Sequence, residues 1–333
     1  MWRIIEPSTI TTNENEHGER RNGYGGSYRY SRLITTLVSL STAVIGDFMV
    51  AELSQSWRND PLSEVMTSNV IRIPNDATLH EAQRLMVHSK VTRLVATDHA
   101  QRLRGVITRR DVVRFLSRDH SGRRLDQMRV RDAASTPVIT LPPSSTATHA
   151  ARTMERSGIS SVVVTLDNGE IQGIVTKTDL CFHYSLFTSR ERVRDFMTRK
   201  VFTVRATHSI FFVASILARQ GISRVPVVNG RLLGMITLSD IVLSAPLMRP
   251  ELIRGKERTK LLREVSLPSA KLTAITASDL MTPKPVTITA NDLLSRAAEL
   301  MIEHGISGLP VTDAKDRLCG IITKTDIVRA IAK

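Results

Sequence analysis

The chain has 333 residues, of which 41% are hydrophobic and 4% aromatic. A chain of this length is expected to form about two domains, and its apolar content suits globular cores while excluding a bundle of membrane helices. Its two cysteines, Cys181 and Cys319, exclude a disulfide framework and a four-thiolate zinc site. We expect both to be buried structural thiols of a cytoplasmic protein.

The charge is strongly positive, because 46 Lys and Arg residues stand against 32 Asp and Glu residues, a net charge of +14. Residues 61–333 hold 40 of the cations and 25 of the acids, whereas residues 1–60 are near neutral at −1. Arginine supplies 36 of the cations, and its planar fork suits phosphate and carboxylate groups. The charge indicates an anionic partner (nucleotide, nucleic acid, acidic protein or membrane surface), unless it reflects only an arginine-rich proteome.

We expect residues 1–59 to form an N-terminal arm and packing element. Residues 9–31 are polar and show no apolar period, so they are expected to be loose. Residues 33–53 are the most apolar stretch, but Thr and Ser dilute their first half and Gly46-Asp47 interrupts them, so they fall short of a membrane span. We expect this stretch to pack against the first domain; a membrane-surface or targeting role is the alternative.

From residue 60 onward the sequence is repetitive, with one short phrase of the form Gly-h-h-Thr-x-x-Asp (h, hydrophobic) occurring four times. The glycines that open successive copies are 68, 61 and 86 residues apart. The four copies are Gly105-Val-Ile-Thr-Arg-Arg-Asp111, Gly173-Ile-Val-Thr-Lys-Thr-Asp179, Gly234-Met-Ile-Thr-Leu-Ser-Asp240 and Gly320-Ile-Ile-Thr-Lys-Thr-Asp326.

Each phrase has the same expected context: a strand, an amphipathic helix, a second strand, and then the strand and helix that carry the phrase. The expected first strands are residues 70–73, 138–141, 201–204 and 285–288, and the second strands are residues 94–97, 162–165, 225–228 and 309–312. The first helix ends at a glycine suited to a left-handed cap in copies two to four: Gly158, Gly221 and Gly305. Copy one has Lys90 there, so its helix is expected to end differently.

The unit is therefore β-α-β-β-α, about 60 residues long, and too small to stand alone. We predict an α+β fold in which four units form two pseudo-symmetric pairs. The expected boundaries are residues 60–120, 121–189, 190–246 and 274–333, with a basic helical insert at residues 247–273.

The repeats resemble CBS domains (the cystathionine β-synthase module). The resemblance rests on the four phrases, on Gly-Ile-Ser-x-Val/Leu-Pro-Val in copies three and four, and on the openings Asp195-Phe-Met-Thr198 and Asp279-Leu-Met-Thr282, with Glu64-Val-Met-Thr67 as a variant. It covers roughly residues 60–333. The arrangement is similar to four-repeat archaeal CBS proteins and to the γ subunit of AMP-activated protein kinase. The resemblance implies paired repeats with an adenosine ligand in the cleft between them.

The resemblance also implies the roles of site residues. Ribose would be held by Asp111, Asp179, Asp240 and Asp326. Phosphate would be held by Thr108, Arg110, Thr176, Thr178, Thr237, Ser239, Thr323 and Thr325, with Arg93 and Arg224. The base would lie among Val201, Val225, Pro226, Val286, Leu309 and Pro310. Independently of the family, a Thr beside a helix N-terminus suits an anion, but Thr-x-x-Asp can equally be a helix cap alone.

Departures from the family pattern favour the second pair as the ligand site. Copies three and four keep Gly-Ile-Ser and the proline, whereas copy one has Val95 and copy two has Val163 in place of that proline.

No catalytic or metal-binding motif occurs, so we expect a regulatory protein and not an enzyme, with no metal and no catalytic cofactor. The leading hypothesis is a cytoplasmic energy sensor that binds AMP, ADP or ATP (or S-adenosylmethionine) and signals to a separate partner protein, as a homodimer without a membrane span. The alternatives are a nucleic-acid-binding protein that uses the basic surface, and an assembly scaffold that binds no ligand.

Overall fold

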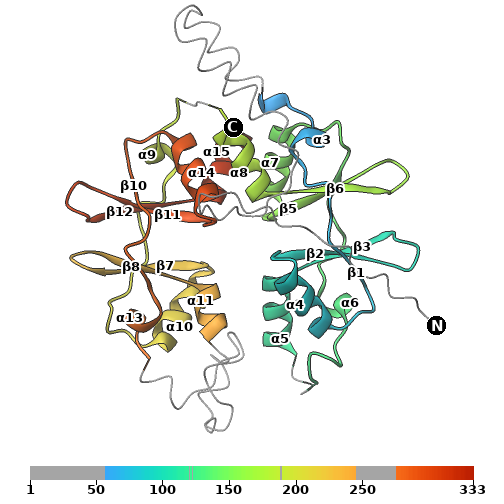
Figure 1. Ribbon diagram of the computed structural model, residues 1–333, viewed down its shortest axis with the longest axis horizontal. Helices are drawn as coiled ribbons and strands as arrows, with labels where there is room; N and C mark the ends of the chain where they lie inside the picture. Colours follow the sequence, from blue (N-terminus) through green and yellow to red (C-terminus); the bar gives the residue numbers. More distant parts are fainter. Residues whose placement is uncertain (1–56, 120, 122, 188–189, 245–274) are drawn as a thin grey trace, which may run out of the picture. The chain divides into compact units, whose positions relative to one another are not determined.

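A computed structural model describes residues 57–119, 121, 123–187, 190–244 and 275–333. The predicted apolar element at residues 33–53 and the predicted basic helix at 247–273 lie outside these residues. Four units follow one another along the chain, and three of them contain the predicted β-α-β-β-α order of elements (Figure 1). Repeat 1 is preceded by the short helix η1(Trp57–Asn59) and consists of α3(Leu62–Val65), β1(Arg72–Pro74), α4(Leu79–His88), β2(Arg93–Thr97), β3(Leu103–Thr108) and α5(Arg109–Arg118).

The other three repeats have the same plan. Repeat 2 consists of α6(Val130–Ala133), β4(Thr140–Leu141), α7(Ala147–Arg156), β5(Ser161–Thr165), β6(Ile171–Thr176) and α8(Lys177–Ser185). Repeat 3 consists of α9(Val193–Phe196), α10(Ile210–Gln220), β7(Arg224–Asn229), β8(Arg231–Thr237) and α11(Leu238–Ser244). Repeat 4 consists of α13(Ala277–Leu280), β9(Thr282–Pro283), β10(Ile288–Thr289), α14(Leu294–Glu303), β11(Gly308–Thr312), β12(Leu318–Thr323) and α15(Lys324–Ala332).

Each repeat contributes to a small sheet of three strands. In repeats 1, 2 and 4 the first strand pairs parallel with the second, and the second pairs antiparallel with the third. Repeat 3 differs from the prediction, because residues 201–204 contribute only the bridge between Val204 and Val227. The third strand of its sheet is β9 from repeat 4, which pairs with β8 through Thr282 and Met235.

The helix ends confirm one prediction and correct another. Gly158, Gly221 and Gly305 have φ angles of 63°, 61° and 62°, the left-handed conformation predicted for them. Lys90 adopts the same conformation with φ 53°, so the helix of repeat 1 ends as the others do. The lysine therefore bears a backbone strain that glycine would avoid.

Repeats pair through their sheets and openings. In the first pair, Thr67 of repeat 1 bridges to Ile174 of repeat 2, and Ser135 of repeat 2 bridges to Val106 of repeat 1. In the second pair, Thr198 of repeat 3 bridges to Ile321 of repeat 4. These reciprocal contacts pair repeat 1 with repeat 2 and repeat 3 with repeat 4, as predicted.

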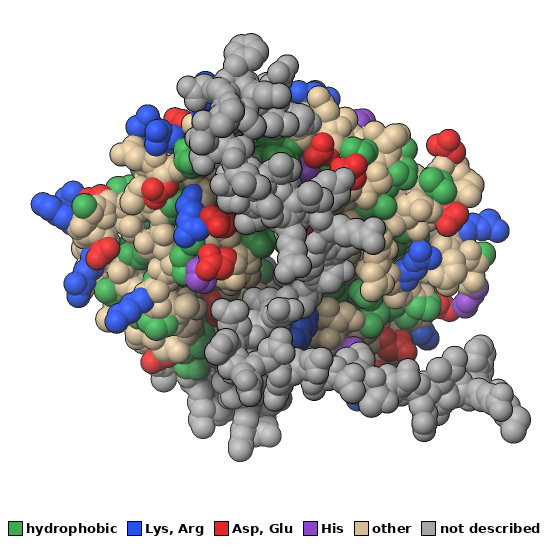
Figure 2. Space-filling view, turned by 45° about the horizontal axis from the view of Figure 1, so that its top comes forward, with side chains coloured by type: hydrophobic (Ala, Val, Ile, Leu, Met, Phe, Trp, Pro, Cys, Tyr) green, Lys and Arg blue, Asp and Glu red, His purple; other side chains and the backbone are tan. Residues whose placement is uncertain are grey.

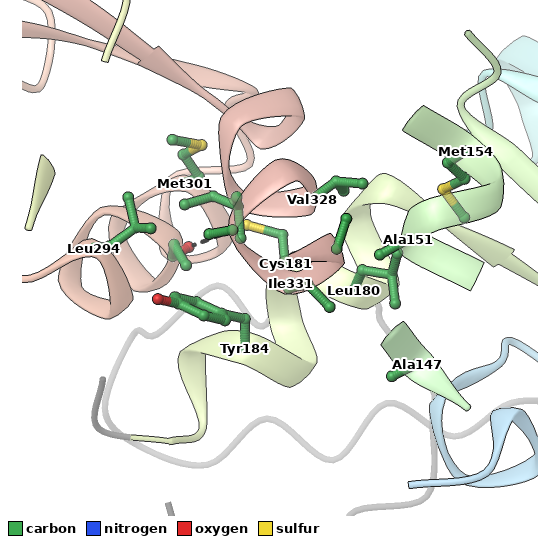
Figure 3. Close-up of a cluster of buried hydrophobic side chains, with 14 of the residues drawn as sticks. Ala147, Ala151, Met154, Leu180, Cys181, Tyr184, Leu294, Met301, Val328 and Ile331 are labelled. Atoms are coloured by element: carbon green, nitrogen blue, oxygen red, sulfur yellow. Dashed lines mark hydrogen bonds between the residues drawn. The ribbon is translucent and has the colours of Figure 1, made fainter. Parts of the chain in front are cut away.

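The two pairs meet through the helices of repeats 2 and 4, where α7 and α8 pack against α14 and α15. Their buried side chains form a single apolar cluster, in which Leu180, Cys181 and Tyr184 of α8 face Val328 and Ile331 of α15 (Figure 3). Small residues, Ala147 and Ala151 on α7 among them, let the helices approach closely. Repeats 1 and 3 bury separate clusters of their own. Cys181 is fully buried as predicted, but Cys319 is exposed, contrary to the prediction.

Trp57 belongs to the cluster shared by repeats 2 and 4 and is 3% exposed. Its ring stacks on Phe187 with centroids 5.6 Å apart and meets the edge of Tyr184 at 5.4 Å. The next residue, Arg58, donates from Nη2 to Oε1 of Glu191 at 2.9 Å. The segment before repeat 1 is therefore fastened to repeat 2 and to the chain that leads to repeat 3.

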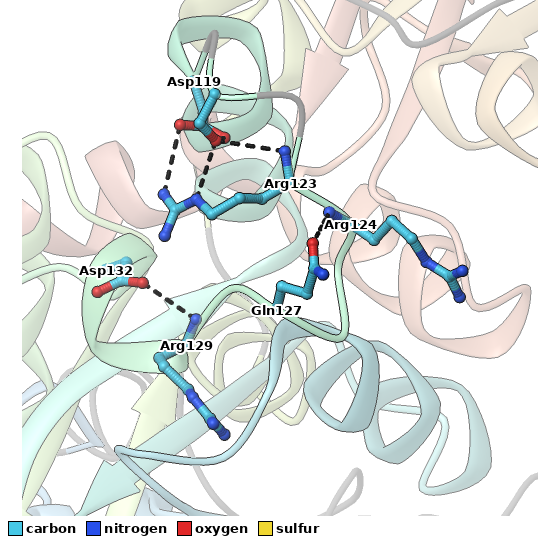
Figure 4. Close-up of polar contacts among 7 residues, drawn as sticks. Asp119, Arg123, Arg124, Gln127, Arg129 and Asp132 are labelled. Carbon is cyan, nitrogen blue, oxygen red and sulfur yellow. Dashed lines mark hydrogen bonds and ion pairs between the residues drawn. The ribbon is translucent and has the colours of Figure 1, made fainter.

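The connection between repeats 1 and 2 is rich in arginine, and local contacts hold it (Figure 4). Arg123 pairs with Asp119 at 3.4 Å. The backbone N–H of Arg124 donates to Gln127 Oε1, and that of Arg129 donates to Asp132 Oδ2, both at 3.0 Å.

Candidate functional site

All four aspartates of the repeated phrase cap the helix that they begin. In each repeat, Oδ2 of the aspartate accepts from the backbone N–H of the threonine three residues before it, at 2.9 Å in Asp111, 2.7 Å in Asp179 and Asp240, and 2.8 Å in Asp326. This threonine is the N-terminal cap of α5, α8 and α15, where it forms a capping box with the aspartate. Capping therefore accounts for one carboxylate oxygen and leaves Oδ1 for other contacts.

In the first pair the second oxygen accepts a hydrogen bond from the opening segment of the paired repeat, whereas Asp326 Oδ1 accepts from Arg329 Nη1 of its own helix at 3.0 Å. Thr67 Oγ1 of repeat 1 donates to Asp179 Oδ1 at 2.9 Å, and Ser135 Oγ of repeat 2 donates to Asp111 Oδ1 at 3.4 Å. Burial raises the pKa of Asp179, and the hydrogen bonds from Thr176 and Thr67 oppose this shift. The carboxylates of Asp111 and Asp179 therefore lie where two repeats meet, a position that helix capping alone does not require.

Two arginines cross from one repeat of each pair to the other. Arg93 of repeat 1 donates from Nη1 to the carbonyl of Ser160 in repeat 2 at 2.7 Å. Arg224 of repeat 3 lies against Gly308 of repeat 4, and its buried Nε has no hydrogen-bond partner among the described residues. Burial lowers the pKa of both guanidinium groups, while Asp179 stabilises the charge of Arg93 and Asp326 that of Arg224. A buried N–H donor without an acceptor is energetically unfavourable, so an anion bound beside Arg224 would be stabilised by accepting this hydrogen bond.

Two lysines cross between the pairs. Lys177 Nζ at the start of α8 donates to Thr325 Oγ1 at 3.1 Å, and Lys324 Nζ at the start of α15 donates to Thr178 Oγ1 at 3.2 Å. Burial lowers the pKa of both ammonium groups, and nearby arginines lower it further: Arg110 and Arg93 beside Lys177, and Arg224 beside Lys324. Mutually repelling buried cations form an electrostatic environment that favours a bound anion.

At two of the four aspartates, the structure gathers both the predicted threonines and several cations. Asp179 lies with Thr176, Thr178, Arg93 and Lys324, and Asp326 lies with Thr323, Thr325, Arg224 and Lys177. The position of the two lysines is occupied by Arg109 in repeat 1 and Leu238 in repeat 3. The sequence favoured the two sites of the second pair, around Asp240 and Asp326. In the structure the cations lie instead around Asp179 in the first pair and Asp326 in the second.

The predicted base-pocket side chains separate into two groups. Val225 and Leu309 are fully buried in the cores of their own repeats, so their side chains cannot also face a ligand. Pro226 and Pro310, the next residues on the same strands, are also buried but point to the opposite face. Val286 is half-buried against the shared cluster, and Val201 is half-exposed. Burial therefore argues against side-chain contacts between a base and Val225 or Leu309, and the base pocket as a whole stays a prediction.

Lys177 and Lys324 were missed as candidates from sequence, although a signal was present. Copies two and four of the phrase both read Thr-Lys-Thr-Asp, and the other two copies do not. The lysines gain importance only because repeats 2 and 4 meet, which the phrase does not reveal.

Among the described residues, no helix is long and apolar enough to cross a membrane. The same residues contain no group of three or more His, Cys, Asp and Glu side chains that could hold a metal ion.

Comparison with known proteins finds related chains. The chain is 25% identical over 280 residues to the uncharacterized protein MJ1225 of Methanocaldococcus jannaschii, which covers 79% of this chain and 95% of that protein. The crystal structure of MJ1225, described as that of a proposed archaeal homologue of g-AMPK, matches with a TM-score of 0.65 and 23% identity over 82% of this chain and 100% of that one. An uncharacterized 33.4 kDa protein of Thermofilum pendens is 30% identical over 281 residues, or 78% of this chain and 87% of that protein.

A shorter match links the chain to a larger enzyme. Homoserine O-acetyltransferase of Methanococcoides burtonii is 34% identical over 147 residues, which is 44% of this chain but only 25% of the enzyme.

The family model described as "CBS domain" matches residues 62–118, 130–185, 193–245 and 277–333, about two thirds of the chain. The chain therefore belongs to the CBS domain family, whose paired domains are regulatory ligand-binding modules.

Proposed function

We propose that this protein is a regulatory sensor that binds adenosine nucleotides at the junctions around Asp179 and Asp326. The observation that carries the proposal is Arg224, whose buried Nε has no acceptor within the described part of the chain and whose charge is stabilised by Asp326. A phosphate beside Arg224 would supply the missing acceptor through a charge-assisted hydrogen bond. Arg93 is the equivalent cation beside Asp179.

In this proposal Oδ1 of each aspartate, which accepts from Thr67 in Asp179 and from Arg329 in Asp326, exchanges that partner for the ribose hydroxyls. The helix that follows receives the phosphate. Thr178 and Thr325 stand in the first turn of α8 and α15, where backbone N–H groups attract anions. Each phosphate would also meet a lysine from the other pair, because Lys324 already contacts Thr178 and Lys177 contacts Thr325.

The cations distinguish between ligands. AMP, ADP and ATP bring phosphate to Lys177, Lys324, Arg93 and Arg224, whereas S-adenosylmethionine carries a positive sulfonium to the same place. Like charges at close range disfavour binding. We therefore expect adenine nucleotides to bind more tightly than S-adenosylmethionine.

The crossing lysines offer a route for a signal. A phosphate that draws Lys177 away from Thr325, or Lys324 away from Thr178, would alter contacts between α8 and α15. Such a change reports on the ligand only if the ligand has different affinities for two arrangements of the pairs. A separate partner protein that reads this arrangement is part of the proposal.

Calorimetric titration with AMP, ADP, ATP and S-adenosylmethionine tests the proposal. We expect nucleotide binding that Asp326→Asn and Arg224→Met each weaken about tenfold or more, the usual value of a hydrogen bond to a charged group. Asp240→Asn is the matched control, because Asp240 caps α11 in the same way but has Leu238 at the lysine position. Absence of nucleotide binding, or an equal loss in the control, would contradict the proposal.

The main alternative is nucleic acid binding by the basic surface. On the face drawn in Figure 2, Lys and Arg side chains are interspersed with Asp and Glu and form no continuous patch. The cations of the candidate site are half-buried between repeats, where a duplex could not reach them. Binding of nucleic acid without nucleotide binding would instead favour this alternative.

A further inference from the structure

A groove of about 270 Å³ lies on the second pair, apart from the helix starts that carry the aspartates. It is formed by the chain that follows α9, the turn between β7 and β8, and the start of β12. Three arginines border it, one from each of these segments: Arg199, Arg231 and Arg317. Val201, which the family resemblance assigns to the base pocket, lies in this groove and supplies apolar surface with Leu318, and Thr203 supplies a hydroxyl group.

The three guanidinium groups are only partly neutralised. Arg317 is held by Asp313, whose Oδ2 lies 2.7 Å from Nη2. Arg199 donates from Nη2 to the carbonyl of Arg194 at 3.3 Å, which leaves its charge unbalanced. Arg231 is exposed and forms no ion pair with any described residue. Three cations against one carboxylate around one groove favour an anion that satisfies several of them together.

The first pair serves as an internal comparison, because its repeats align with those of the second. The positions of Arg199, Arg231 and Arg317 are occupied there by Ser68, Arg102 and Glu170. The position of Thr203 is occupied by Arg72, whose Nη2 donates to the carbonyl of Ile171 at 3.2 Å, across the place that corresponds to the groove. The cationic border is therefore a property of the second pair alone and not of the fold.

We propose that this groove is a second, independent binding site for a small molecule that carries phosphate groups. Guanidinium forks bind phosphate oxygens bidentately, and two or more phosphate groups would engage arginines from different segments. The apolar surface of Val201 and Leu318 would contact the carbon skeleton of such a molecule. A duplex nucleic acid is too broad for a groove of 270 Å³, so the site suits a metabolite.

Inorganic pyrophosphate is the probe, titrated calorimetrically at fixed ionic strength because exposed charges are screened by salt. We expect Arg231→Ala and Arg199→Ala each to weaken one pyrophosphate site about tenfold, the effect of losing one charge-assisted hydrogen bond. Arg102→Ala, at the matching position of the first pair, should leave binding unchanged. Circular dichroism and the urea midpoint confirm that each variant is folded.

The double variant Lys177→Met/Lys324→Met separates this site from the proposed nucleotide sites. The groove bordered by Arg199, Arg231 and Arg317 should still bind pyrophosphate in that variant, even if the variant no longer binds nucleotides. The proposal is overturned if pyrophosphate does not bind, if the lysine variant abolishes all pyrophosphate binding, or if Arg199→Ala and Arg231→Ala bind it as tightly as the unaltered protein.

Discussion

Met66 of repeat 1 packs directly on Gly173 of repeat 2. Its Cγ lies 2.8 Å from the place that a Cβ on Gly173 would take, and its sulfur lies closer still. The second pair repeats the contact reciprocally, with Met281 Sδ at 2.6 Å from that place on Gly234 and Met197 Sδ at 2.9 Å on Gly320. In three of the four phrases, the glycine and the methionine of the paired repeat's opening are therefore two halves of one contact between paired repeats.

This contact predicts that Gly173→Ala lowers the free energy of unfolding by about 1–3 kcal/mol, since the added methyl group forces Met66 to move. In the background of Met66→Ala the same substitution should cost less than about 1 kcal/mol, which a double-mutant cycle by urea unfolding measures. Gly105→Ala is the comparison, because the atom that it meets across the pair, Ala134 Cβ at 3.0 Å, is fixed to the backbone, so Met66→Ala should not reduce its cost. Equal losses in the single and double backgrounds would contradict the interpretation.

Trp57 is predicted to contribute strongly to the shared core of repeats 2 and 4. Trp57→Ala should lower the free energy of unfolding by about 3–5 kcal/mol, the usual cost of removing a buried aromatic ring. Phe182→Ala on the neighbouring α8 is the control, because Phe182 is 46% exposed, and it should cost under about 1 kcal/mol. Similar losses for the two variants, measured by urea unfolding, would show that Trp57 is peripheral.

The environment of His183 is expected to make the free energy of unfolding depend on pH. Burial lowers its pKa below 6.5, although the carbonyl of Trp57, at 3.3 Å from Nε2, and the carboxylate of Asp60, at 3.1 Å, favour the protonated ring. The unfolded chain therefore takes up this proton at a higher pH than the folded chain. The neutral His183 ring therefore makes its full contribution to the free energy of unfolding above about pH 6.5. This contribution is lost as the pH falls toward the pKa of His183 in the folded chain.

Urea unfolding at pH 7.5, 6.5 and 5.5 checks this prediction. His183→Gln should reduce the loss of stability between the last two values, because glutamine does not titrate. His149→Gln on α7, where the residue is exposed, is the control and should keep the original slope. An unchanged slope in His183→Gln would assign the pH dependence to other groups.

Lys324 is predicted to favour ligand binding at the expense of stability. Burial and Arg224 disfavour its charge, so Lys324→Met should leave the ligand-free protein as stable as before or more stable. The same variant should bind adenine nucleotides about tenfold more weakly, because it loses a charge-assisted hydrogen bond. Arg109→Met, at the same position in repeat 1, is exposed and should change neither property. Thermal unfolding with and without ATP separates the two effects.

The sequence by itself determined the elements that depend on near neighbours. Four strand-to-helix junctions follow from Thr-x-x-Asp, because a threonine and an aspartate three residues apart cap a helix with no help from the rest of the chain. The glycine caps at positions 158, 221 and 305 follow equally from local backbone sterics. Lys90 shows the limit of this reasoning, since the surrounding fold imposes the left-handed conformation against the preference of the residue.

Only the tertiary structure decided which repeats share a core and where their charges meet. Lys177 and Thr325 are 148 residues apart in sequence and touch because α8 and α15 bury their apolar faces against each other. Packing of each repeat's own core turns Val225 and Leu309 inward, a choice of strand face that single-sequence patterns leave open where both faces are apolar. Burial of surface between distant segments, and not local preference, selects these contacts and with them the candidate site.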